Sequence, residues 1–165
     1  MEYIWKYESP LGMMELASDG FNLIGAWFIG QKHFGEALGE EAKEECLPVF
    51  QKAIEWLSIY FAGKEPGFAL PLSMRGTSFQ KEVWDILLSI PYGHTVTYGE
   101  IASILAKRRG LMAMSSQAVG SAVGRNPISI IVPCHRVLGA RGSLGGYAAG
   151  NERKTYLLSL EKEGK

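Results

Sequence analysis

Cysteine is scarce in this sequence. The 165 residues include only Cys46 and Cys134, one in each half of the chain. Small secreted domains use several cysteine pairs as staples, so this class is excluded, and two lone cysteines fit a reducing cytoplasm. No Cys/His spacing typical of a zinc site occurs, and we expect neither a metal nor a cofactor.

Long apolar runs are also absent. No stretch of about 18 apolar residues is available to cross a bilayer. Five charged residues interrupt the first twenty positions, which argues against a signal-peptide core. We therefore expect a cytoplasmic protein without a membrane partner. A composition of 47% hydrophobic and 21% charged residues is that of a folded globular protein and not of a disordered one.

The chain has no net charge, but its two halves differ in sign. Residues 1–75 contain six Lys and Arg against eleven Asp and Glu, whereas residues 76–165 contain eleven against six. The basic excess of the second half favours an acidic partner, and nucleic acid is the first candidate. A chance distribution of surface charge, without any function, explains the same charge counts equally well.

Turn residues divide the chain near its middle. Between positions 63 and 76, three glycines and two prolines break every periodic pattern where the charge changes sign. We therefore expect two domains, residues 1–75 and 76–165. In the first, short aromatic and branched segments alternate with turns, which predicts three antiparallel strands, and a helical repeat follows from Phe50 to Phe61.

The second half has mainly helical patterns. Apolar stripes predict helices over 77–90 and from 97 to the basic stretch 107–109, each begun by a capping threonine. A third helix, 115–124, consists almost entirely of small residues. Two helices with a turn and nearby cations outline a helix-turn-helix DNA reader. The outline alone is a weak signal, because most helix pairs bind nothing.

Cys134 is the candidate nucleophile. It follows Pro133, which fixes the approach of the chain, and it adjoins His135 and Arg136, whose positive charges would lower the pKa of a thiol. Cys46, in contrast, follows a run of glutamates that would raise the pKa of its thiol. On the tetrapeptide alone, a buried structural cysteine beside an exposed histidine explains the pattern at least as well.

A longer set of motifs resembles the methylated-DNA–protein-cysteine methyltransferases, the O6-alkylguanine DNA repair family. The matching motifs are Gly76-Thr77-x-Phe79-Gln80, Thr97-Tyr98-Gly99-Glu100, Pro133-Cys134-His135-Arg136-Val137, Gly145-Gly146-Tyr147 and Lys154-x-x-Leu157-Leu158-x-x-Glu161. The likeness covers essentially all of residues 76–165, whereas residues 1–75 match only in outline. It implies an α/β protein with an N-terminal ribonuclease-H-like domain, a small antiparallel sheet with a helix. A mostly helical, winged-helix-like DNA-binding domain follows.

The resemblance implies direct-reversal DNA repair in which the protein is consumed. A damaged guanine is flipped out of double-stranded DNA, and the Cys134 thiolate attacks its O6-alkyl carbon. The alkyl group stays on sulfur, so each molecule acts once. The implied enzyme is a monomeric methylated-DNA–protein-cysteine S-methyltransferase acting on O6-alkylguanine, with O4-alkylthymine left open as a second substrate.

The resemblance also implies roles for the site residues. His135 would take the thiol proton through a water, and Glu161 would orient that histidine. Tyr98 would donate its hydroxyl to the departing guanine, and Asn126 would brace the turn near Cys134. Without the resemblance, Glu161 is one more solvated charge and Tyr98 a core aromatic. The residues expected to hold the base are Val123, Val137, Tyr147 and Ala148.

Contacts with DNA are implied for the small-residue helix and the cations around it. In the family this helix docks in the minor groove, and many members place an arginine where this chain has Gln117, to fill the hole left by the flipped base. The other expected DNA contacts are Lys107, Arg108, Arg109, Ala118, Gly120, Ser121, Ala122, Arg125 and Arg136.

Three other functions stay open. An alkyltransferase-like binding protein would capture the lesion without transfer, but such relatives lack the cysteine that this chain has at 134. A cysteine hydrolase using Cys134 and His135 would turn over, which an activity assay detects. A plain helix-turn-helix regulator would leave Cys134 without a role, and its DNA footprint would be insensitive to alkylation.

Overall fold

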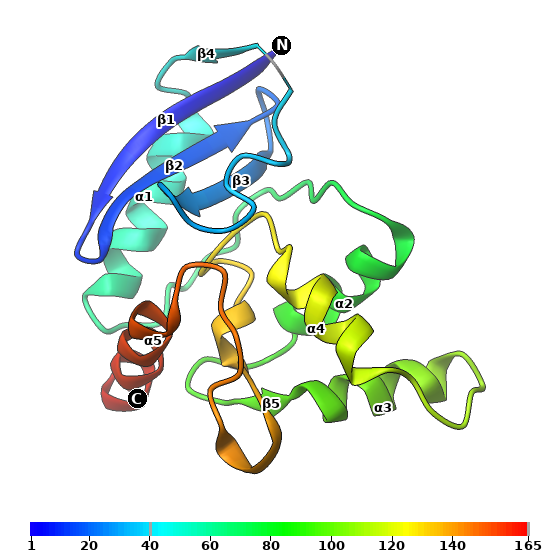
Figure 1. Ribbon diagram of the computed structural model, residues 1–165. Coiled ribbons are helices and arrows are strands. Elements are labelled where there is room, and N and C mark those ends of the chain that lie inside the picture. The colour runs from blue at the N-terminus through cyan, green and yellow to red at the C-terminus, as the bar shows by residue number, and fades with distance from the viewer. Residues whose placement is uncertain (40, 165) are drawn as a thin grey trace.

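The N-terminal half of the chain forms a mixed four-stranded sheet (Figure 1). The computed structural model describes residues 1–39 and 41–164. The sheet has the order β3-β2-β1-β4, in which the first three strands are antiparallel and β4 pairs in parallel with β1. Its strands are β1 (Glu2–Ser9), β2 (Gly12–Ser18), β3 (Leu23–Phe28) and β4 (Ala42–Glu44). The three predicted strands are present, but β4 was missed, because three polar residues carry no apolar alternation.

A single helix, α1 (Pro48–Phe61), closes this sheet. Its proline lies in the first turn, where a missing backbone N–H costs nothing. Phe50, Ala53, Leu57 and Tyr60 form its fully buried stripe, as the helical repeat in the sequence predicts. Tyr60, near the C-terminal end of α1, reaches the second half of the chain.

The C-terminal half is mainly helical. Its elements are α2 (Ser78–Leu88), β5 (Val96–Thr97), α3 (Tyr98–Arg108), α4 (Ser116–Gly124), β6 (Val137–Leu138) and α5 (Asn151–Glu163). Thr77 and Gln80 form the predicted reciprocal capping box of α2, and Thr97 caps α3 by accepting from the Glu100 amide at 3.0 Å. β5 and β6 pair in parallel, and α4 packs on both α2 and α3. None of the described helices is long and apolar enough to span a membrane.

One continuous hydrophobic core joins the two halves. The Ala26 amide of β3 donates to the Pro127 carbonyl at 2.8 Å, and the Ser129 amide donates back to the Ala26 carbonyl at 2.8 Å. The indole N–H of Trp84 in α2 donates to the Ala122 carbonyl of α4 at 2.8 Å. The sheet therefore holds the segment that leads from α4 to Cys134, and α2 holds α4 itself.

Candidate active site

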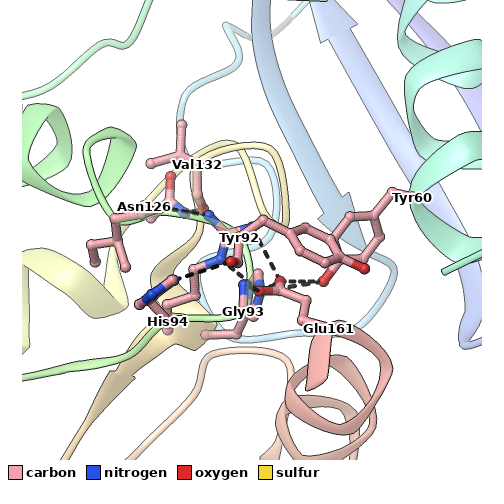
Figure 2. Close-up of polar contacts among 10 residues, drawn as sticks. Tyr60, Tyr92, Gly93, His94, Asn126, Val132 and Glu161 are labelled. Carbon is pink, nitrogen blue, oxygen red and sulfur yellow. Dashed lines mark hydrogen bonds and ion pairs between the residues drawn. The ribbon is translucent and has the colours of Figure 1, made fainter. Parts of the chain in front are cut away.

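Cys134 lies at the start of a 3-10 turn, Cys134–Arg136. The backbone folds tightly at Pro133, so that the Cys134 amide donates to the Val132 carbonyl at 2.8 Å. The Asn126 side chain holds this turn. Its amide donates to the Val132 carbonyl at 2.8 Å, and its oxygen accepts from the Ile128 amide at 3.0 Å (Figure 2). Asn126 thus braces the backbone before Cys134, a residue that is only 5% exposed.

Burial raises the pKa of the Cys134 thiol. A hydrogen bond with Asn126 and the positive charge of Lys154 oppose this effect, but they do not outweigh it. The prediction that His135 and Arg136 stabilise the thiolate is wrong, because both side chains turn toward Glu161. The resting thiol is neutral and needs a base to become a nucleophile.

Glu161 of α5 is the centre of a buried polar cluster (Figure 2). Its carboxylate accepts hydrogen bonds from the Tyr60 hydroxyl at 2.6 Å, the Gly93 amide at 2.9 Å and Arg136 Nε at 2.8 Å. Burial alone would raise its pKa, but hydrogen bonds from His135, Arg136 and Tyr60 prevail and lower that pKa to about 2. Glu161 is therefore an ionised anchor and not a solvated surface charge.

His135 is completely buried between Cys134 and this cluster. Its Nε2 lies 2.5 Å from Glu161 Oε2, so the carboxylate selects the tautomer in which Nε2 carries the proton. Burial lowers the pKa of the imidazole, which leaves it neutral. Nδ1 is buried and has no hydrogen-bond partner among the described residues. This lone pair is free to accept a proton.

Arg136 also belongs to the buried cluster. Its Nη1 donates to the Ile90 carbonyl at 2.7 Å, its Nε donates to Glu161, and the side chain lies over the Tyr92 ring. Only 8% of the residue is exposed, and its guanidinium holds the Glu161 carboxylate in place. The prediction that Arg136 contacts DNA is therefore wrong.

A cavity of about 700 Å³ opens in front of Cys134. It brings together most of the residues expected around the base and on the reading helix: Tyr98, Gln117, Gly120, Ser121, Val123, Arg125, Tyr147 and Ala148. Val137 is not among the residues that line it; its side chain is buried and its carbonyl accepts from Lys154 Nζ at 2.6 Å. Ala122 is buried against Trp84, which contradicts the expected DNA contact, whereas Ala118 is exposed.

The predicted phosphate-binding cations differ in their surroundings. Lys107 and Arg108 are exposed at the end of α3. Arg109 pairs with Glu82 of α2 at 2.8 Å and lies over the Phe79 ring, so it anchors α3 to α2. Arg125 pairs with Glu36 of the N-terminal half at 3.0 Å. The part of the chain that the structure describes has no cluster of acidic, histidine or cysteine side chains suited to a metal ion.

Two family models match this chain. The model described as 6-O-methylguanine DNA methyltransferase, DNA binding domain, matches residues 78–163, and the ribonuclease-like domain of the same methyltransferase matches residues 3–74. The chain belongs to the O6-methylguanine DNA methyltransferase family. Membership confirms the family, the fold class and the enzyme class that the sequence predicts.

Similar proteins match along nearly their whole length. The Methanosarcina acetivorans methylated-DNA–protein-cysteine methyltransferase is 45% identical over 155 residues, 94% of this chain and 95% of the relative. The Mycobacterium tuberculosis enzyme of the same name is 43% identical, over 94% of this chain and 89% of its own. The crystal structure of M. tuberculosis OGT in complex with DNA superposes with a TM-score of 0.84 at 41% identity, covering 98% of this chain and 94% of that one.

Lys154 is a residue of this methyltransferase site that the sequence reasoning missed as a functional group. It is fully buried on α5, and its Nζ donates to the carbonyls of Val137, Leu144 and Gly146. The seven-residue spacing to Glu161 places both on one face of α5, which was a usable signal. Burial lowers the pKa of Lys154 to about 8, and the neighbouring Cys134 acts in the opposite direction.

The N-terminal half also contributes to the methyltransferase site. Tyr60 donates to Glu161 from α1, and its hydroxyl lies 3.3 Å from His135 Nε2. Lys32 and His33 line the cavity in front of Cys134, and the Lys32 amide donates to the Ala148 carbonyl at 3.1 Å. No local pattern in the sequence marks these residues, because their partners lie a hundred or so positions away.

Proposed function

We propose that this chain repairs O6-alkylguanine in double-stranded DNA by moving the alkyl group to Cys134, once per molecule. The main support for this proposal is the position of Cys134 in a cavity of about 700 Å³, next to the helix of small residues. His135 and Glu161 lie behind Cys134 and are in contact with each other. Such a volume accommodates a nucleobase turned out of the duplex. O4-alkylthymine is the second substrate we propose, because it presents an alkyl group on an equivalent exocyclic oxygen.

The proposed reaction begins with removal of the thiol proton. Glu161 holds the proton of His135 on Nε2, so Nδ1 accepts the proton of Cys134 through an intervening water. The sulfur then attacks the alkyl carbon and forms a C–S bond while the C–O bond breaks. The electron pair of that bond stays on the guanine, and the alkylated thioether remains on the protein.

Tyr98 is the proposed proton donor to the departing guanine. Its hydroxyl lies at the cavity and now donates to the Gly146 carbonyl over a long 3.3 Å, a bond that a base can replace. Gly145 has a φ of +67°, and a Cβ there would come within 2.9 Å of the Tyr98 ring. This glycine therefore lets the loop close over Tyr98, while Tyr147 and Ala148 of the same loop would hold the base.

The proposed DNA contact centres on the exposed start of α4. Ala118, Gly120 and Ser121 would face the minor groove, and Gln117 would fill the place of the flipped base. The exposed cations Lys107 and Arg108 would bind phosphates, while Arg125 would first have to release Glu36. We propose that the protein acts as a monomer in the cytoplasm, where its two free cysteines stay reduced.

A stoichiometric titration tests the proposed function. Increasing amounts of a duplex containing O6-methylguanine are incubated with a fixed amount of protein, and the remaining lesion is quantified after digestion. Loss of lesion is expected to stop at one equivalent per protein molecule. Continued loss beyond one equivalent would favour a turnover enzyme such as a hydrolase, and lesion binding without loss would favour a recognition protein.

Replacing Lys154 by methionine is expected to raise the pKa of the Cys134 thiol, because the substitution removes a positive charge that acts on this buried sulfur. The rate of methyl transfer near neutral pH should fall about tenfold for each unit of added thiol pKa. The pH–rate profile should shift toward higher pH, which loss of packing alone would not cause. Lys162→Met, on the exposed side of α5, is the matched control, and an unshifted profile for Lys154→Met would contradict the role.

Replacing Gln117 by arginine is expected to tighten binding to duplexes that contain the lesion. A guanidinium adds charge and a planar stacking surface where the flipped base leaves a hole. One added phosphate or base contact of this kind corresponds to roughly tenfold in affinity. Gln51→Arg, exposed on α1, adds the same charge away from the cavity. Equal or weaker affinity of Gln117→Arg would show that this position does not fill the hole.

A further inference from the structure

The loop between α3 and α4 projects away from the sheet (Figure 1) and is tied at both ends. α3 ends at Arg108, and Gly110, just after its C-cap Arg109, has a φ of +66°. The Gly110 amide donates to the Lys107 carbonyl and the Leu111 amide to the Ala106 carbonyl at 2.8 Å. This pair of bonds is a Schellman motif. At the other end, the Ser115 hydroxyl accepts from the Ala118 amide at 3.1 Å. Only residues 112–114 lie between these two fixed points.

The tip of this loop presents apolar side chains to solvent. Met112 is fully exposed and Leu111 is 51% exposed, whereas Met114 is partly buried against the core and anchors the loop. Arg109 adds a second anchor through its ion pair with Glu82. Leu111 and Met112 therefore lie on a short loop whose two ends are held in place.

The apolar tip is continuous with the face proposed to bind DNA. A second hollow, of about 500 Å³, is bordered by Lys107, Leu111 and Met112, and it shares Gly99 and Ser116 with the cavity of Cys134. Lys107 and Arg108 lie at the end of α3, shortly before the tip, and make no ion pair with any residue in 1–39 or 41–164. Apolar side chains next to exposed cations complement a nucleic acid, whose phosphates surround apolar sugars and stacked bases.

We propose that Leu111 and Met112 form an apolar wedge that enters the minor groove beside the lesion and loosens the neighbouring base step. Lys107 and Arg108 hold the flanking phosphates. Leucine and methionine are among the side chains that proteins insert between base steps, and unstacking a neighbour makes extrusion of the damaged base easier. The inference rests on the proposed docking of α4 on DNA and extends that contact to a second element.

The test compares full-length wild type with the double variant Leu111→Ser/Met112→Ser. The probe is a duplex containing O6-methylguanine, with 2-aminopurine at each neighbouring step in turn to report unstacking. Partial burial of the two side chains corresponds to about a tenfold change in affinity, which is the weakening expected of the variant. The fluorescence rise at one neighbouring step should disappear, while the slope of affinity against salt stays the same, because an apolar contact releases no counterions.

Three controls make the result specific. Phe21→Ser removes another highly exposed apolar side chain, 84% exposed in the turn between β2 and β3, and should change neither affinity nor fluorescence. Lys107→Ala should reduce the salt slope by about one without abolishing the fluorescence rise. Alkylation by the free base O6-benzylguanine should proceed equally in wild type and double variant, because this reaction does not need the wedge.

Two results would overturn the wedge alone. One is unchanged affinity and fluorescence in the double variant; the other is self-association of wild type through the tip, lost in the variant, with equal DNA binding by the monomers. Failure of wild type to bind any duplex would overturn the proposed function and the wedge with it.

Discussion

Replacing Cys134 by alanine is expected to abolish methyl transfer completely. The substitution removes the only sulfur among the described residues that line the cavity, and this sulfur is the proposed nucleophile. Transfer of a labelled methyl group from O6-methylguanine DNA to protein, followed over time, measures the effect. Cys46→Ala is the matched control, because Cys46 is exposed on the N-terminal half and should not affect the rate.

Binding of the lesion by the Cys134→Ala variant should be retained. The side chain is small and almost buried, so its loss leaves the cavity walls and the exposed face of α4 in place. A variant that still acquires the labelled methyl group would contradict the assignment of the nucleophile. A variant that loses transfer and folding together would be compared with Cys134→Ser, which keeps the volume of the site.

Replacing Glu161 by glutamine is expected to lower the transfer rate by about 100-fold or more, the usual contribution of an oriented general base. Without the carboxylate, His135 is free to adopt the wrong tautomer, and Nδ1 no longer has to be the accepting nitrogen. The buried guanidinium of Arg136 also loses its counter-charge. Removing one partner of such a pair costs about 3–5 kcal/mol in the free energy of unfolding.

The pH dependence of stability separates the two effects of the Glu161 substitution. The pKa of Glu161 falls from its ordinary value of 4.5 to about 2 on folding. Its contribution to stability is therefore complete above pH 4.5 and is lost as the pH falls toward 2. Denaturant unfolding of wild type and Glu161→Gln should give curves that converge at low pH. Glu163→Gln, exposed on the same helix, should match wild type in both rate and stability, and a constant gap at all pH values would contradict the assignment.

The helices of the C-terminal half could be predicted because their signals are local. Thr77 and Thr97 cap the helices they were expected to begin, and the small residues of α4 mark a helix that must approach another surface. The position of Cys134 at a proline-fixed turn was also visible in the sequence. Each of these features depends on residues within a few positions of one another.

The polar cluster could not be predicted in the same way. Tyr60 and Glu161 are 101 positions apart, and only the packing of α1 against the second half brings them together. In the sequence, Arg136 looks like a surface cation. In the structure, its guanidinium is buried and donates hydrogen bonds to the Ile90 carbonyl and Glu161. The charge that reaches Cys134 comes from Lys154 on α5, and not from its sequence neighbours, which face away.

Mass spectrometry of the protein after reaction with an O6-methylguanine duplex tests the central claim most directly. The intact protein should gain the mass of one methylene, and only one, however large the excess of DNA, and digestion should locate the gain on the peptide that contains Cys134. The lesion should disappear in equal amount. A gain on Cys46, or complete repair of the lesion without any change in protein mass, would contradict the account.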